Sequence, residues 1–153
     1  MPTHQQQEEI GIYFITFTCY KWLPLFEITN TYKGVYKWFE IIQSKGAEIV
    51  GYVIMPNHLH VLIYIKNGIL NLNKIVANGK RFLAYEIVKK LKELHLEEIL
   101  ETLKKGVQKK EIVKGKKHQV FRLSFDAKLC FDEKMVEQKL DYIHGNPVNR
   151  NGT

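Results

Sequence analysis

Two histidines separated by a single leucine, His58 and His60, interrupt the apolar segment YVIMPNHLHVLIYI at residues 52–65. The β-branched and aromatic residues around them predict a strand. Alternate side chains of a strand share one face of a sheet, so both imidazoles would project the same way and could chelate one metal ion. The alternative is a pair of partly exposed, hydrogen-bonded histidines at a strand start. Because polar groups in an apolar segment cost free energy, a functional site is favoured.

A second set of chemically capable residues lies in LDYIHGNP, residues 140–147. Tyr142 and Asn146 are four residues apart and share one helical face. The Asn146 amide oxygen is a candidate third metal ligand, whereas His144, the rival, faces away from Tyr142. Imidazole nitrogens with an amide oxygen suit Mg²⁺ or Mn²⁺ better than a closed zinc site. Tyr142 is then a candidate nucleophile, since a metal that polarises a phosphate helps a phenol of pKa about 10 to attack. The alternative is a ring packed on the sheet with its hydroxyl exposed.

Regular elements that could position these groups follow from apolar periodicity and turn residues. Pro56-Asn57 is turn chemistry between two strands, and Asp132 begins the final helix. We predict strands over 10–20, 47–55 and 58–65, a further candidate strand over 118–125, and helices over 29–44, 72–95 and 132–144. Residues 97–110 are expected to form either a short helix or a charged, mobile segment. This order predicts an α+β ferredoxin-like sandwich, an antiparallel sheet with helices packed on it and the tyrosine on the C-terminal helix.

The composition is that of one globular domain spanning residues 1–153, with 45% hydrophobic residues and a polar segment, 1–9, expected to be a disordered tail. No apolar stretch reaches the roughly 18 residues of a membrane span, and no signal peptide is apparent. Cys19 and Cys130, the only cysteines, predict a reduced, cytoplasmic protein.

Positive charge is concentrated in one part of the chain. The net charge is +7, and residues 79–117 hold twelve Lys or Arg against six Glu. The alternative is a solvated, lysine-rich surface, but the concentration favours a polyanionic partner, most simply nucleic acid. Trp22, Trp38 and Phe121 could stack on unpaired bases, although core packing is favoured for each.

The segments GYVIMPNHLHVLI (51–63) and LDYIHGNPV (140–148) together resemble the single-tyrosine HUH transposases, a family of insertion-sequence transposases. Within that family the chain looks most like the group associated with repetitive extragenic palindromes (REP). GKRFLAYEIVKKL (79–91) and GKKHQVFRLSFDAK (115–128) look like the intervening segments. The resemblance implies that His58, His60 and Asn146 bind the metal and that Tyr142 is the nucleophile.

The resemblance also implies the activity. Such enzymes bind single-stranded or hairpin DNA, and the tyrosine attacks a phosphodiester to give a 5′-phosphotyrosine and a free 3′-hydroxyl. With the basic charge, it suggests five phosphate contacts: Lys80, Arg81, Lys89, Lys116 and Lys117. A homodimer and a monomer both stay open. One alternative is a domesticated, non-catalytic binder of hairpin DNA or RNA, which the short segment after NPV favours. Another is a metal-dependent hydrolase that uses water in place of tyrosine.

Overall fold

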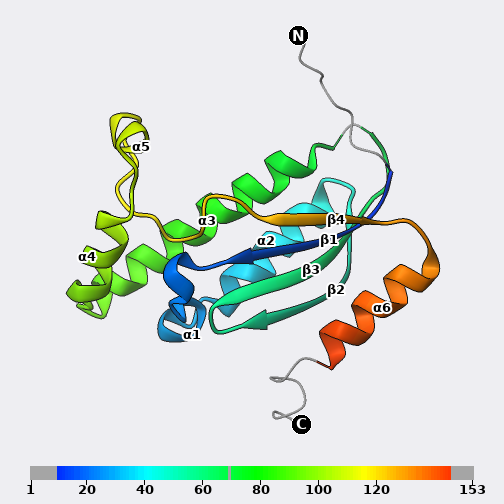
Figure 1. Ribbon diagram of the computed structural model, residues 1–153, viewed down its shortest axis with the longest axis horizontal. Coiled ribbons are helices and arrows are strands. Elements are labelled where there is room, and N and C mark those ends of the chain that lie inside the picture. The colour runs from blue at the N-terminus through cyan, green and yellow to red at the C-terminus, as the bar shows by residue number, and fades with distance from the viewer. Residues whose placement is uncertain (1–9, 69, 146–153) are drawn as a thin grey trace.

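The computed structural model describes residues 10–68 and 70–145, so the predicted tail at 1–9 and the candidate ligand Asn146 lie outside the described residues. Four strands form one sheet in the order β2-β3-β1-β4, and every neighbouring pair is antiparallel. Figure 1 shows the strands, which are β1 (Gly11–Thr18), β2 (Glu48–Met55), β3 (His58–Ile65) and β4 (Asp126–Cys130). With the helices between them, they form the predicted ferredoxin-like α+β sandwich.

One face of the sheet carries the main core. The helices α1 (Leu25–Thr29), α2 (Tyr32–Ser44) and α3 (Leu72–Glu93) pack there, and the Leu83, Ile87 and Leu91 side chains of α3 are fully buried. Trp38 of α2 lies directly against Gly79 of α3, at a point where a Cβ would collide with the indole ring. This close approach lets the two helices pack tightly and buries Trp38 to 2% exposure.

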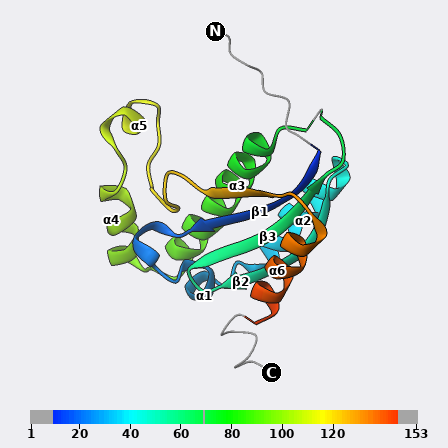
Figure 2. The same cartoon turned by 45° about the vertical axis from the view of Figure 1, so that its right-hand side comes forward.

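The helix α6 (Glu133–His144) packs on the opposite face, as the rotated view of Figure 2 shows. It begins at Asp132, whose side chain accepts a hydrogen bond from the Met135 amide, an N-cap that the sequence predicts. Ile143 at its far end packs with Val53 and Leu62 in a second, smaller core. In the part of the chain that the structure describes, α6 is the helix that covers this second face.

The prediction of a strand over 118–125 is wrong. The segment forms one isolated bridge, between Cys19 and Phe121, and the fourth strand begins at Asp126. The apolar residues Val120 and Phe121 of this segment are instead buried in the main core. The backbone amide of Arg122 donates to the Thr18 carbonyl, which ties the segment to the end of β1.

The long loop between α3 and β4 holds two short helices, α4 (Glu97–Lys105) and α5 (Lys109–Val113), where one short helix or a mobile segment was predicted. A 3₁₀ turn, η1 (Tyr20–Trp22), follows β1. Both cysteines are free and buried, as expected. Among the described helices, none combines the length and apolar character needed to span a bilayer.

Candidate active site and nucleic-acid groove

Strand β3 places both histidines on the sheet face that α6 partly covers. His58 lies opposite Thr18 and His60 opposite Thr16 in the pairing with β1. The two imidazole centroids are 4.8 Å apart. His60 is only 6% exposed, whereas Leu59 between them is fully buried in the main core on the other face. The alternation predicted for a strand therefore holds, and the two rings are neighbours.

Each imidazole uses its Nδ1 atom for a hydrogen bond. His58 Nδ1 lies 2.7 Å from the Asn57 amide oxygen, to which it donates, and His60 Nδ1 lies 2.7 Å from the Thr16 hydroxyl. The Nε2 atom of His60 is buried without a hydrogen-bond partner among residues 10–68 and 70–145. An engaged Nδ1 and an unpartnered Nε2 are what a metal-binding imidazole needs, because the hydrogen bond at Nδ1 fixes the ring while Nε2 is left to coordinate.

The electrostatic environment keeps both imidazoles neutral. Burial lowers the pKa of His58 below its ordinary value. Burial also lowers the pKa of His60 to about 4, with smaller contributions from the neighbouring His58 and from Lys139. At neutral pH both rings are therefore uncharged, which is the form that binds a metal ion.

Helix α6 brings Tyr142 to the same place. Its ring centroid lies 5.2 Å from that of His60, edge to face. Phe14 stacks on His60 at 5.3 Å and contacts the Tyr142 ring at 6.1 Å. Tyr142 is 55% exposed, while the next residue, Ile143, is buried and anchors the helix end. The structure thus brings His58, His60 and Tyr142 of one chain together, with a solvent-accessible tyrosine.

A complete set of protein metal ligands is not found within the described ranges. No group of three His, Cys, Asp or Glu side chains there is placed to hold a metal ion. His144 is exposed at the end of α6, and Asn146 is outside these ranges. The two imidazoles fit a metal site with further ligands from Asn146, water or substrate, so the role of Asn146 stays a prediction.

Lys139 is a further residue beside this site, and it is not among the residues predicted from the sequence. Its ammonium lies 4.7 Å from the Phe14 ring centroid, and the side chain is half-buried. It forms no ion pair with any described residue. Lys139 precedes Tyr142 by three residues on α6, so the i,i+3 spacing on one helical face could have revealed it.

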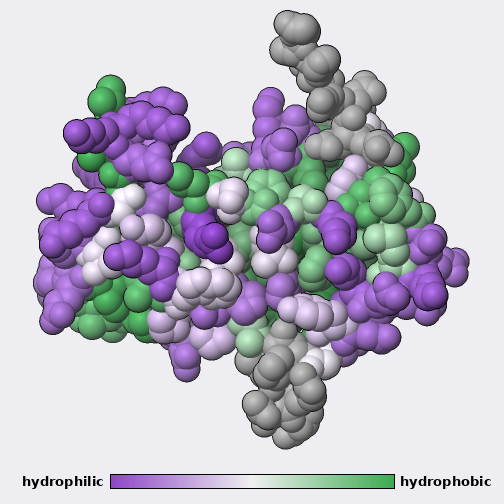
Figure 3. Space-filling model, in the orientation of Figure 1, coloured by the Kyte–Doolittle hydropathy of each residue, from purple (hydrophilic) through white to green (hydrophobic). Residues whose placement is uncertain are grey.

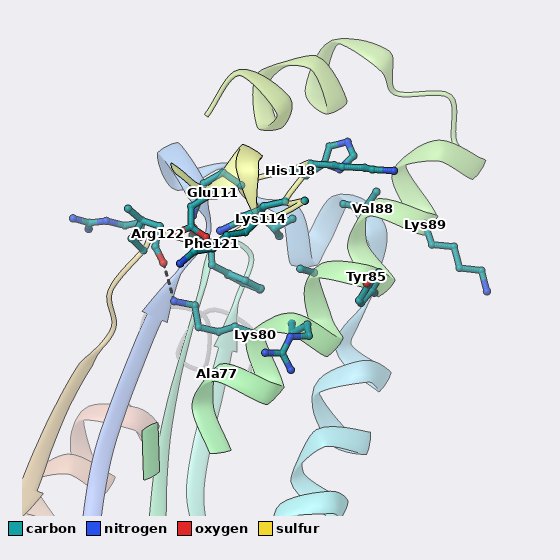
Figure 4. A pocket seen from close by; sticks show the side chains of 18 of the residues that line it. Ala77, Lys80, Tyr85, Val88, Lys89, Glu111, Lys114, His118, Phe121 and Arg122 are labelled. Atoms are coloured by element: carbon teal, nitrogen blue, oxygen red, sulfur yellow. Dashed lines mark hydrogen bonds between the residues drawn. The ribbon is translucent and has the colours of Figure 1, made fainter. Parts of the chain in front are cut away.

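The five lysine and arginine residues predicted to contact phosphates line a single groove. It lies between α3 and residues 111–125, has a volume of about 990 Å³ and is open to solvent (Figure 4). One carboxylate, that of Glu111, lines it against eight cationic side chains: Lys80, Arg81, Lys89, Lys92, Lys114, Lys116, Lys117 and Arg122. Hydrophilic residues also gather beside it over α4 and α5 in Figure 3. The groove is therefore strongly electropositive.

Lys80 is a partly buried cation in the wall of this groove. Its ammonium donates a 2.8 Å hydrogen bond to the Arg122 carbonyl and lies 5.9 Å from the Phe125 ring. Burial, and then the charge of Lys116, lower its pKa to about 8. The Arg122 amide donates a hydrogen bond to the Thr18 carbonyl, and Thr18 lies opposite His58 in the sheet. The wall of the groove therefore adjoins the end of β1 that pairs with the start of β3, where the two histidines lie.

The three aromatic residues considered for base stacking divide into two kinds. Trp38 and Phe121 are buried, so core packing is confirmed for both. The prediction of core packing is wrong for Trp22. This residue is 56% exposed, and its ring centroid lies 6.1 Å from that of His58.

Comparison with known proteins supports the fold. No protein-family model and no curated protein sequence matches the chain. A REP-associated tyrosine transposase, solved with a bound REP hairpin, superposes with a TM-score of 0.58 at 17% identity, covering 100% of this chain and 76% of that one. A transposase candidate from Deinococcus radiodurans R1 superposes with a TM-score of 0.53 at 15% identity, covering 95% and 97%. The predicted resemblance to tyrosine transposases is thus confirmed at the level of the fold.

Proposed function

We propose that this protein is a metal-dependent single-tyrosine transposase, a site-specific endonuclease and strand transferase for single-stranded DNA in the bacterial cytoplasm. The observation that carries the proposal is the position of Tyr142, whose ring centroid lies 5.2 Å from that of the buried His60, on a fold shared with a tyrosine transposase. The Nε2 atom of that histidine has no hydrogen-bond partner among the described residues. The charged groove and the fold agree with a DNA substrate.

Each residue of the site has a role in the proposed reaction. His58 and His60, with Asn146, would hold Mg²⁺ or Mn²⁺, which when bound polarises the scissile phosphate. The Tyr142 oxygen forms a bond to phosphorus, and the bond from phosphorus to the 3′-oxygen breaks. The phenol loses its proton, and the leaving oxygen takes one up as a free 3′-hydroxyl. Because one phosphodiester replaces another, attack by a 3′-hydroxyl reverses the step without an external energy source.

The groove between α3 and residues 111–125 would hold the DNA backbone. Lys80, Arg81, Lys89, Lys116 and Lys117 all line it, which supports them as phosphate contacts. Hairpin DNA is the proposed ligand because the similar transposase was solved on a REP hairpin. Tyr142 lies beside the histidines of its own chain, so a monomer suffices for the proposed reaction, and a homodimer is compatible with it.

A second candidate function is a non-catalytic binder of hairpin DNA or RNA. The described residues complete the electropositive groove by themselves, whereas they supply only two of the metal ligands. Binding through the groove therefore needs neither the metal nor Tyr142.

The decisive experiment looks for a covalent adduct. Labelled single-stranded oligonucleotides that carry the palindromes flanking the gene are incubated with the protein and Mg²⁺ or Mn²⁺, then run on a denaturing gel. We expect a protein–DNA adduct that Tyr142→Phe abolishes while hairpin affinity is kept. Tyr36→Phe, an exposed tyrosine on α2, is the matched control and keeps the adduct.

Other outcomes of this experiment separate the alternatives. An adduct that survives Tyr142→Phe contradicts the assignment of the nucleophile. Tight hairpin binding without an adduct in either metal supports the non-catalytic binder. Cleavage without an adduct that is lost in His58→Ala supports attack by water.

A further inference from the structure

Trp22 is an exposed indole at the edge of the candidate active site. Its side chain is 56% exposed, and its ring lies 6.1 Å from that of His58, edge to face. Most tryptophans are largely buried because the indole is the largest apolar side chain. The main core therefore does not account for this residue, in contrast to Trp38, which is 2% exposed.

The backbone that presents Trp22 is strained. Lys21 has φ 54° and Trp22 has φ 58°, so two consecutive non-glycine residues occupy the left-handed region. This conformation costs free energy for residues with a Cβ, and such strain is found at functional sites where the surroundings hold it in place. Here it turns an indole outward beside His58.

Several contacts hold the turn in this conformation. The Trp22 amide donates to the Cys19 carbonyl at 3.0 Å, and the Asn57 side-chain amide reaches the Trp22 carbonyl at 3.5 Å. The ring of Tyr20 lies against Gly106, where a Cβ would be 2.5 Å from the Tyr20 Cζ. Asn57 also accepts the hydrogen bond from His58, so one side chain links the indole's backbone to the candidate metal ligand.

We infer that Trp22 stacks on an unpaired base of the DNA strand next to the phosphodiester that Tyr142 attacks. The inference rests on the proposed function and adds that the site recognises a single-stranded nucleotide, whatever its base. An exposed aromatic ring on a turn whose backbone is held by hydrogen bonds offers a π-face to any base, and a stacked base fixes the adjoining phosphate. The position beside His58 places that phosphate near the two imidazoles.

Intrinsic fluorescence tests the inference without metal or cleavage. The chain has two tryptophans, and Trp38 is buried, so a stacking base should quench mainly Trp22. The probes are a DNA hairpin with a short single-stranded thymidine extension and the same hairpin with blunt ends. We expect quenching by the extended hairpin only, and loss of that quenching in Trp22→Phe.

Affinity for the extended hairpin gives a second measurement. Trp22→Ala should weaken it about 5- to 100-fold, the range for losing one stacked base, while Trp22→Phe weakens it less. Phe131→Ala, an exposed aromatic after the far end of β4, should leave it unchanged. Quenching that persists in Trp22→Phe, or wild-type affinity in Trp22→Ala, overturns the inference. Both results are independent of the adduct, whose absence would overturn only the proposed catalysis.

Discussion

At the scale of single residues, the two imidazoles of the site are oriented by hydrogen bonds between their Nδ1 atoms and neighbouring side chains. Asn57 accepts from His58 Nδ1, and Thr16 bonds to His60 Nδ1, both at 2.7 Å. These contacts fix the ring planes and leave the Nε2 atoms to face the metal ion that we propose. The site therefore depends on a turn residue and on a neighbouring strand as much as on the histidines.

Removing these orienting contacts should weaken metal binding. Thr16→Val and Asn57→Ala are each expected to lower the affinity for Mn²⁺ about 10- to 100-fold, the usual effect of losing such a partner, and Asn57→Asp should restore part of it. Calorimetric titration of Mn²⁺ into the DNA-free protein measures this. Ser44→Ala, an exposed hydroxyl at the end of α2, is the control. Unchanged Mn²⁺ affinity in both variants would show that these hydrogen bonds do not prepare a metal site.

Lys139 should act on the reacting phosphate. Its ammonium lies by Phe14, whose ring contacts both His60 and Tyr142, and it has no acidic partner among the described residues. Lys139→Met is expected to slow adduct formation at saturating DNA about 100-fold, because one stabilising donor for the developing charge is lost. The Kd for the same DNA should change only a few-fold. Lys134→Met, which changes an exposed lysine on the same helix, is the control and should form the adduct at the wild-type rate. A wild-type rate of adduct formation in Lys139→Met would show that Lys139 takes no part in the reaction.

At the scale of elements, the site depends on how α6 docks on the sheet. Ile143 is buried against Val53 and Leu62 in the small core, next to Tyr142 in the chain. The main core lies on the other face and does not include α6. The position of the tyrosine is therefore held by a small set of apolar contacts that can be weakened separately from the rest of the fold.

Ile143→Ala should release α6 without unfolding the molecule. The truncation of a buried isoleucine costs about 2–5 kcal/mol, and here the cost falls on the docking of α6. We expect faster hydrogen exchange in α6 than in α3, adduct formation reduced at least about 10-fold, and hairpin affinity kept. Met135→Ala, at the opposite end of α6, should affect the adduct less. An equal rise of exchange in α3 and α6 would show that the two cores unfold as one.

The elements that carry the site were predictable, and the reason is local. The strand of His58 and His60 has a clear β pattern bounded by Pro56-Asn57, and α6 has a capping Asp132 and a predicted end at His144. The fourth strand was predicted at the wrong residues because Val120 and Phe121 are typical strand residues. In the structure they are buried in the main core without forming a strand. Asp126–Cys130 has a weak pattern, and its pairing with β1 is a long-range contact that no local signal contains.

At the scale of the whole molecule, the wall of the groove adjoins the end of the sheet where the histidines begin. The surplus of positive charge at residues 79–117 predicted a polyanionic binding partner. The five Lys and Arg side chains predicted to contact phosphates do line one groove. Arg122 was missed because its contribution depends on how residues 111–125 fold back over α3. The same folding ties residues 111–125 to the end of β1, opposite His58, and this is the path that the backbone of the proposed hairpin would follow from the groove toward Tyr142.

The groove should make DNA affinity depend on pH above neutrality. Burial and the charge of Lys116 lower the pKa of Lys80 to about 8, so its positive charge is present near pH 7 and lost near pH 9. Ordinary lysines, with a pKa of about 10.4, keep their charge over this range. Hairpin affinity should therefore fall from about pH 7 to about pH 9, and the slope of log K against log salt should shrink by about one phosphate contact.

Two variants identify the group that titrates. Lys80→Arg should bind with nearly the same affinity at about pH 7 and about pH 9, because a guanidinium stays charged throughout. The hairpin affinity of Lys80→Met should also be insensitive to pH. It should be weaker than that of the wild type at neutral pH and equal to that of the wild type at high pH. Fluorescence anisotropy of a labelled hairpin at two salt concentrations measures both quantities. A wild type whose affinity changes no more with pH than that of Lys80→Arg would mean that Lys80 keeps its charge in the groove or does not contact the DNA.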